Sequence, residues 1–115
     1  MELNKTVQKA VKISQFLQKR LGKQMARSSI TSVIDQIDYQ SFEIPCLLYD
    51  YYSAVFQYET GTIGCVIFIG RESSVSIIDG RRCESEADLE TFIQELQKEI
   101  ELRVPDKFLK SRGWL

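Results

Sequence analysis

A row of lysines near the start of the chain is the feature best suited to binding chemistry. Five lysines recur at intervals of four, three, seven and four residues: Lys5, Lys9, Lys12, Lys19 and Lys23. On a helix this spacing confines them to a stripe about 80° wide, and Phe16 falls inside the stripe. Residues 5–27 contain seven basic side chains and no acidic one. The stripe is therefore a candidate surface for an anionic partner.

Three interpretations of the lysine stripe stay open at this stage. Lysines are common on solvated helix faces, and such a face needs no partner. The same row can lie against an acidic protein surface. It can also contact nucleic-acid phosphates while Phe16 stacks on a base. The single aromatic residue among the lysines is what favours a functional role.

The sequence contains few residues that are suited to catalysis. The chain contains no histidine, which removes Ser-His-Asp and Cys-His nucleophile activation and histidine zinc sites. Cys46 and Cys65 lie among strand-forming residues, where a thiol is usually a buried hydrophobe. An enzymatic alternative would need a carboxylate site or Cys83, which precedes a predicted helix, where a thiol pKa can fall. We expect no enzyme activity, no metal and no cofactor.

The lysine stripe must be positioned by a long helix over residues 3–26. Its apolar side chains keep three- and four-residue spacing opposite the lysines, so Phe16 is expected to be exposed unless another element covers it. Residues 28–39 are ambiguous between helix and strand, and their mixed alternating faces favour a short helix with a serine cap. A final helix is predicted from the Ser85 cap to about Arg103, before Pro105. This last helix is rich in acids, with seven between residues 84 and 101.

The middle of the chain is predicted to form an antiparallel meander of four strands. The strands cover residues 42–48, 51–59, 62–69 and 74–78, which are rich in Ile, Val, Phe and Tyr. Thr60-Gly61 predicts a tight hairpin, and Asp79-Gly80 predicts a further turn. Pro45 lacks an N–H donor, so the first strand is expected at a sheet edge.

The predicted sheet has more apolar surface than two flanking helices on one face would cover. In residues 62–69 both faces are largely apolar, whereas a one-sided sheet alternates apolar and polar residues. We expect the second face to be covered by residues 28–39 with the C-terminal tail, or by a second copy of the chain. Aromatic side chains that suit an interface are Tyr49, Tyr51, Tyr52 and Trp114. Trp114 either docks on the domain, as we expect, or presents a hook to a partner.

These patterns predict a single α+β domain over residues 1–115, with a four-stranded antiparallel meander between an N-terminal and a C-terminal helix. No apolar run approaches the roughly 20 residues of a membrane-spanning helix, and no secretory signal is visible. We expect a cytoplasmic protein. The predicted function is a non-enzymatic interaction protein, of the adaptor or the inhibitor and immunity type, that binds a protein partner and forms a homodimer. The alternative is a nucleic-acid-binding protein that uses the basic helix.

Overall fold

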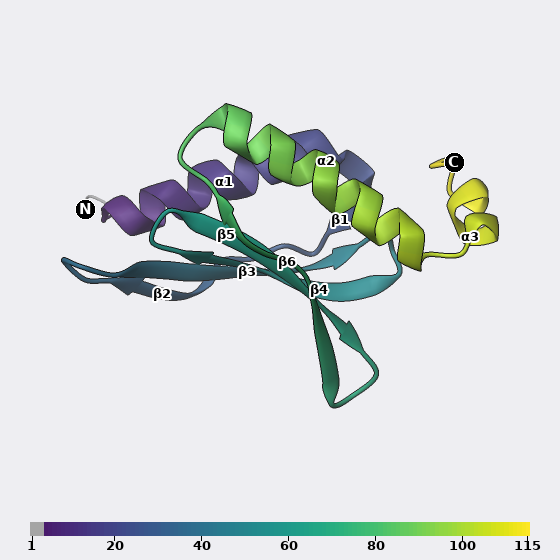
Figure 1. The fold of residues 1–115 in the computed structure, drawn as a ribbon, viewed down its shortest axis with the longest axis horizontal. Helices are drawn as coiled ribbons and strands as arrows, with labels where there is room; N and C mark the ends of the chain where they lie inside the picture. Colours follow the sequence, from purple (N-terminus) through teal and green to yellow (C-terminus); the bar gives the residue numbers. More distant parts are fainter. Residues whose placement is uncertain (1–3) are drawn as a thin grey trace.

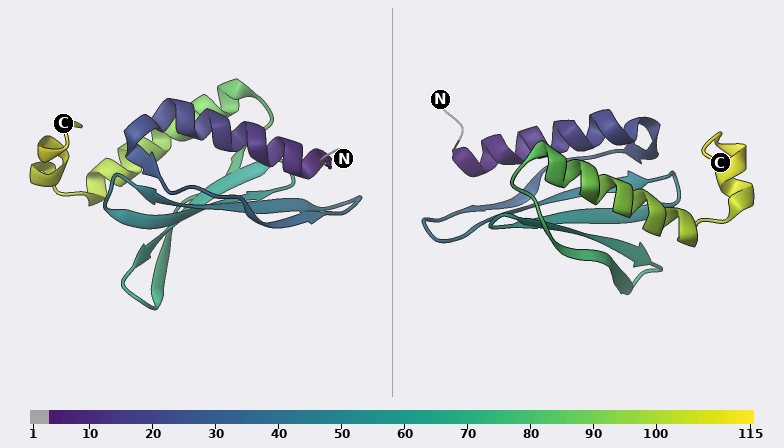
Figure 2. Two further views of the ribbon diagram at one scale, coloured as in Figure 1. Left: turned by 180° about the vertical axis from the view of Figure 1, so that it is seen from behind. Right: turned by 45° about the horizontal axis from the view of Figure 1, so that its top comes forward.

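The computed structural model describes residues 4–115 and places a six-stranded antiparallel sheet beneath two long helices (Figure 1). The strands follow the order β1-β3-β4-β5-β6, and β2 also pairs with β3. The two views of Figure 2 show both long helices on the same face of the sheet. The elements, in chain order, are α1 (Lys5–Leu21), η1 (Gly22–Gln24), β1 (Met25–Ala26), β2 (Thr31–Asp35), β3 (Gln40–Leu48), β4 (Tyr52–Glu59), β5 (Thr62–Ile69), β6 (Ser73–Arg82), α2 (Glu86–Arg103) and α3 (Asp106–Ser111).

The α+β class, the antiparallel sheet and the flanking helices are confirmed, but the predicted count of four strands is wrong. β1 was not expected, and residues 28–39 contain the strand that was the alternative interpretation, whereas the favoured helix does not form. Residues 31–35 instead pair with β3, with Thr31 opposite Glu43 and Asp35 opposite Gln40. All five β2 residues are exposed, so the apolar residues that are spaced as in a helix do not pack into the core. Their β-branched side chains suit an edge strand, and pairing with β3 decides the outcome.

The first helix is shorter than its apolar pattern predicts. Asn4 caps it by accepting a hydrogen bond from the Val7 amide at 2.7 Å. It ends at Leu21 because Gly22 adopts a φ of 55°, which a helix cannot continue. The chain then turns through η1 into β1, where Met25 pairs with Leu48. Leu3, part of the predicted helix, lies outside the described residues.

Pro45 does not mark a sheet edge as predicted, because β3 has neighbours on both sides. Its Cα partner in β4 is Val55. On the other side, β1 pairs with residues 47 and 48 and β2 with residues 40–43, so Pro45 faces the interval between them. The Pro45 carbonyl accepts a hydrogen bond from the Ser29 amide at 3.2 Å in that interval. The missing N–H donor therefore falls where no ladder requires it.

The Thr60-Gly61 hairpin is confirmed, whereas Asp79-Gly80 is not the end of a strand. Thr60 and Gly61 both have positive φ, as a two-residue hairpin of the primed type requires. Gly80, with a φ of 59°, lies inside β6 at a bulge, and the strand continues to Arg82. The Asp79-Gly80 pair, which the sequence predicts to be a turn, instead lies at a β-bulge that accommodates one extra residue in β6.

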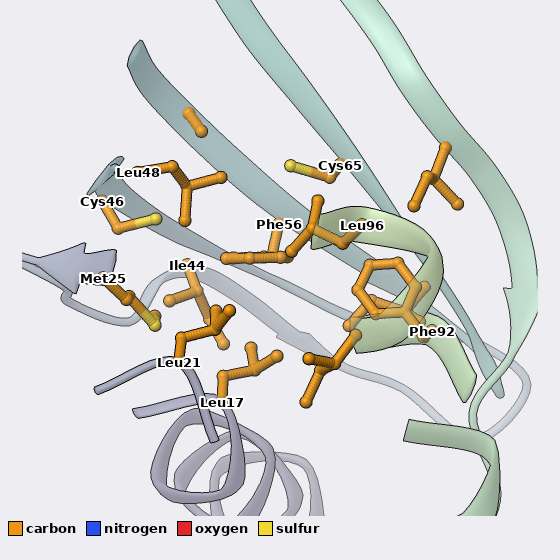
Figure 3. Close-up of a cluster of buried hydrophobic side chains, with 14 of the residues drawn as sticks. Leu17, Leu21, Met25, Ile44, Cys46, Leu48, Phe56, Cys65, Phe92 and Leu96 are labelled. Atoms are coloured by element: carbon orange, nitrogen blue, oxygen red, sulfur yellow. The ribbon is translucent and has the colours of Figure 1, made fainter. Parts of the chain in front are cut away.

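The core lies between the helices and one face of the sheet (Figure 3). Leu17 and Leu21 of α1 and Phe92 and Leu96 of α2 pack over the central strands. Ser85 caps α2, as predicted, by accepting a hydrogen bond from the Asp88 amide. β3 and β4 alternate toward this layer, with Phe42, Ile44, Cys46 and Leu48 of β3 all buried. The two predicted helix stripes thus meet on a single layer.

The second face of the sheet is covered neither by residues 28–39 nor by the C-terminal tail. Residues 31–35 extend the sheet sideways, and α3 lies beyond the end of α2 (Figures 1 and 2). Among residues 4–115, no helix is long and apolar enough to cross a membrane.

Candidate binding groove between the two long helices

A groove of about 760 Å³ lies between α1 and the N-terminal half of α2. Its α1 wall carries Lys12, Phe16 and Lys19, which belong to the predicted stripe. Its α2 wall carries Glu86 and Glu90. A smaller hollow of about 180 Å³ continues from it toward Lys9 and Cys83 and shares Lys12, Phe16 and Glu86 with the groove. The structure therefore gathers the central part of the stripe around one concave surface.

Phe16 is half-buried, because another element covers part of the side of α1 on which it lies. The ring packs against the hydrophobic core and lines both hollows between the helices. The pattern of α1 alone placed it opposite the core, but α2 lies beside α1 and covers part of that side. Phe16 thus forms an apolar floor between lysines, an arrangement that suits an apolar side chain with acidic neighbours.

The five lysines are not equivalent in the structure. Lys9 donates a hydrogen bond to the Tyr58 hydroxyl at 3.1 Å, and its ammonium lies 5.5 Å from the centre of the same ring. Lys23 lies in η1, beyond the end of α1. Within residues 4–115, no ion pair joins Lys5, Lys12, Lys19 or Lys23 to a carboxylate. Four of the five ammonium groups therefore have no carboxylate partner in the described part of the chain and can meet an outside anion.

The acids of the last helix are, in contrast, mostly engaged within the chain. Arg20 of α1 forms an ion pair with Glu90, and Arg81 of β6 binds Glu95 at 2.8 Å. Of the seven acids, six have a basic or hydroxyl partner: Glu84 and Asp88 with Arg82, Glu90 with Arg20, Glu95 with Arg81, Glu99 with Arg103, and Glu101 with the Tyr49 hydroxyl. Sequence reasoning found neither Arg20 nor Glu90 as a groove residue, because 70 residues separate them. Only packing brings them together.

The tyrosines and Trp114 lie at the far end of the sheet and serve mainly structural contacts. Tyr49 is fully buried, and its hydroxyl donates to Glu101 at 2.9 Å. Burial is the main cause, and the hydrogen bond to Glu101 the second, of a Tyr49 pKa that lies well above its ordinary value. The Tyr52 hydroxyl donates to the Arg103 carbonyl at 3.0 Å.

Trp114 docks on the domain as expected, with its ring 5.3 Å from that of Tyr49. It does not lie on the open sheet face. Tyr51 contacts the Phe108 ring at 5.1 Å and is 43% exposed. The structure therefore separates these aromatic residues from the lysine groove, and the ten predicted binding residues do not form one surface.

Cys83 lies beside the groove, and burial raises its pKa from the ordinary 9.0 to about 11, although nearby Lys9 opposes the shift. The thiol is 4% exposed. We expect Cys83 to react with iodoacetamide at pH 8 far more slowly in the folded protein than in denaturant. With a pKa of about 11, about one Cys83 thiol in a thousand is ionised at pH 8 in the folded protein. Mass spectrometry of the Cys83 peptide measures both rates. Equal rates would contradict the expectation.

The same shift fixes the sign of a pH effect on stability. Because burial favours the neutral thiol, its contribution to folding is fully present below pH 9.0 and is lost as pH rises through about 11. Cys46 acts in the same direction, since burial raises its pKa to about 12. Urea unfolding at increasing alkaline pH tests this, with a Cys83→Ala variant expected to lose part of the dependence.

Among residues 4–115, no three Cys, Asp or Glu side chains are grouped so that they could hold a metal ion. The arrangement between α1 and α2 offers ammonium groups, an apolar floor and two carboxylates, which is binding chemistry. The chain matches no protein-family model, no curated protein and no solved structure.

Proposed function

We propose that this chain is a non-enzymatic protein-binding module, an adaptor or an inhibitor, that takes an acidic segment of a partner along the groove between α1 and α2. The observation that carries the proposal is the imbalance of ion pairs. Among residues 4–115, the lysines of α1 have no carboxylate partner, while most acids of α2 are engaged. Charge of one sign is thus available on the α1 wall for complementary contacts.

Phe16 adds an apolar contact to this electrostatic surface. It lies between Lys12 and Lys19 on the groove wall and is half-buried against the core. A partner segment with acidic residues next to one apolar side chain complements both features. Burial of that side chain supplies affinity, and the lysines supply orientation and association rate.

A nucleic-acid partner fits the groove less well. A phosphate backbone that lies along Lys12 and Lys19 would also approach Glu86 on the opposite wall, which, unlike Glu90, has no basic partner among the described residues. Like charges across an interface cost binding energy, and a duplex carries a charge about every 1.7 Å of its axis. A peptide can instead place its acids on the lysine wall alone. We therefore favour a protein partner over the nucleic-acid alternative.

Anisotropy of a labelled glutamate-rich peptide with interspersed leucines tests the proposal. We expect the Lys12→Glu/Lys19→Glu variant to bind it at least about tenfold more weakly, because two favourable contacts become repulsive. The matched control is Lys107→Glu/Lys110→Glu, which makes the same charge change on exposed α3 residues outside the groove. The control should bind as the unchanged protein does.

Two outcomes would overturn the proposal. The first is no peptide binding, or an equal loss in the α3 control, which would reduce the stripe to a solvated face. The second is tighter binding of a labelled single-stranded oligonucleotide that weakens steeply with salt and disappears in Lys12→Glu/Lys19→Glu. That result would establish the nucleic-acid alternative.

A further inference from the structure

β6 forms an edge of the sheet, and its outer side pairs with no strand of the described chain. It spans Ser73–Arg82 and pairs only with β5. Natural edge strands are usually protected by lysines, prolines or a covering element. The stretch Ser73–Ile78 contains no charged residue and no proline. Its unpaired backbone groups are therefore a template for another strand.

The tip of the β5–β6 hairpin extends past the rest of the sheet. The β4–β5 ladder ends at Ala54 opposite Ile67, while the β5–β6 ladder continues to Ile69 opposite Ser73. Figure 1 shows this hairpin as an arm that projects away from the helices. The arm carries exposed apolar side chains, with Phe68 at 43%, Ile69 at 50% and Val75 at 37%. A two-stranded ribbon alone is at best marginally stable in water.

We propose that β6 pairs antiparallel with β6 of a second copy of this chain, which joins the two sheets across a two-fold axis. The proposal does not rest on the partner groove, which lies between the helices. Directly opposed residues of an antiparallel pair share a face, so the axis must pass where one residue faces its own copy. Val75 and Ser76 are the two central choices in the uncharged stretch.

Charge selects Val75 as the residue on the axis. With Val75 opposite its copy, a residue count along the strand brings Arg71 in the hairpin turn toward Asp79 of the second copy, beside the irregular part of β6 between Ile78 and Arg81, and this approach occurs twice. With Ser76 on the axis, the same count brings Arg71 toward Arg81, which offers no opposite charge and is already paired with Glu95. The Val75 register also sets two β-branched side chains directly opposite each other, a favourable cross-strand pair. Sheet continuation of this kind is a recognised mode of association.

Cross-linking through a single introduced cysteine tests the register. Opposed Cα atoms lie about 4.5–5.5 Å apart, within the range of about 4.4–6.8 Å for disulfides. Val75→Cys is therefore expected to form a covalent dimer under mild oxidation. Ser73→Cys is the matched control, since its two copies would lie about 13 Å apart, four residues at about 3.3 Å each. The native cysteines are all buried and serve as an internal background.

Charge exchange tests the same contact without oxidation. In sedimentation equilibrium, Arg71→Asp and Asp79→Arg should each weaken the dimer about tenfold, and the combined exchange should restore it. Circular dichroism checks that each variant is folded. A monomer at millimolar concentration, a stronger cross-link from Ser73→Cys than from Val75→Cys, or a tighter dimer for Arg71→Asp would overturn the proposal. The Lys12→Glu/Lys19→Glu variant should dimerise normally, so each proposal can fail alone.

Discussion

Phe92→Ala is expected to lower the free energy of unfolding by about 3–5 kcal/mol. Phe92 is 1% exposed, and its ring lies 6.0 Å from that of Phe56 in an edge-to-face contact. It joins α2 to the middle of the sheet, so truncation removes buried area and leaves a cavity between two layers. A domain of this size is usually stable by about 5–15 kcal/mol, which makes the loss a large fraction of the total.

Leu102→Ala is the matched control for Phe92→Ala. Leu102 belongs to the same helix and is 77% exposed, so its truncation should change stability by less than about 0.5 kcal/mol. Urea unfolding monitored by circular dichroism measures both variants at the same pH. Comparable losses for the two variants would show that α2 does not pack on the sheet as described.

Gly64→Ala is expected to destabilise the protein by about 1–3 kcal/mol, although alanine normally suits a strand better than glycine. A Cβ at Gly64 would lie 2.8 Å from the Ile78 carbonyl oxygen and 3.3 Å from the Asp79 Cα. Both atoms belong to the backbone of β6 at its bulge, so relief requires the two strands to separate. The clash therefore opposes, and should exceed, the gain in strand propensity.

The sign of the Gly64→Ala effect is the decisive measurement. Thr62→Ala, on the same strand and at an exposed position, is the control and should cost much less. Urea unfolding gives the free energies, and amide hydrogen exchange in β6 reports local separation of the strands. An unchanged or raised stability for Gly64→Ala would mean that β6 does not approach β5 this closely.

The groove and the arm lie on different parts of the molecule, and together they have a consequence for affinity. The dimer proposed through β6 would carry two of the proposed grooves and would engage two acidic segments of one partner or of a partner dimer. Linked binding raises the apparent affinity without any new contact. At a concentration where Arg71→Asp shifts the protein to the monomer, that variant should keep its affinity for a single peptide and lose only the bivalent gain.

Elements with local signals could be predicted from the amino-acid sequence. The apolar stripes predicted the core faces of α1 and α2, and Ser85 and Thr60-Gly61 placed a cap and a hairpin correctly. The limits of β5 were predicted without error. Each of these depends on residues within a few positions of one another, where periodicity and turn chemistry decide the backbone.

Other features depend on contacts between segments that are far apart in the sequence, and these could be seen only in the folded structure. Residues 31–35 became a strand because β3 offered an edge, and Pro45 lay inside the sheet because β1 and β2 leave an interval. α2 half-buries Phe16, and Arg20 forms an ion pair with Glu90 across the groove. No local pattern specifies such pairings, because their free energy comes from contacts formed only when distant segments meet.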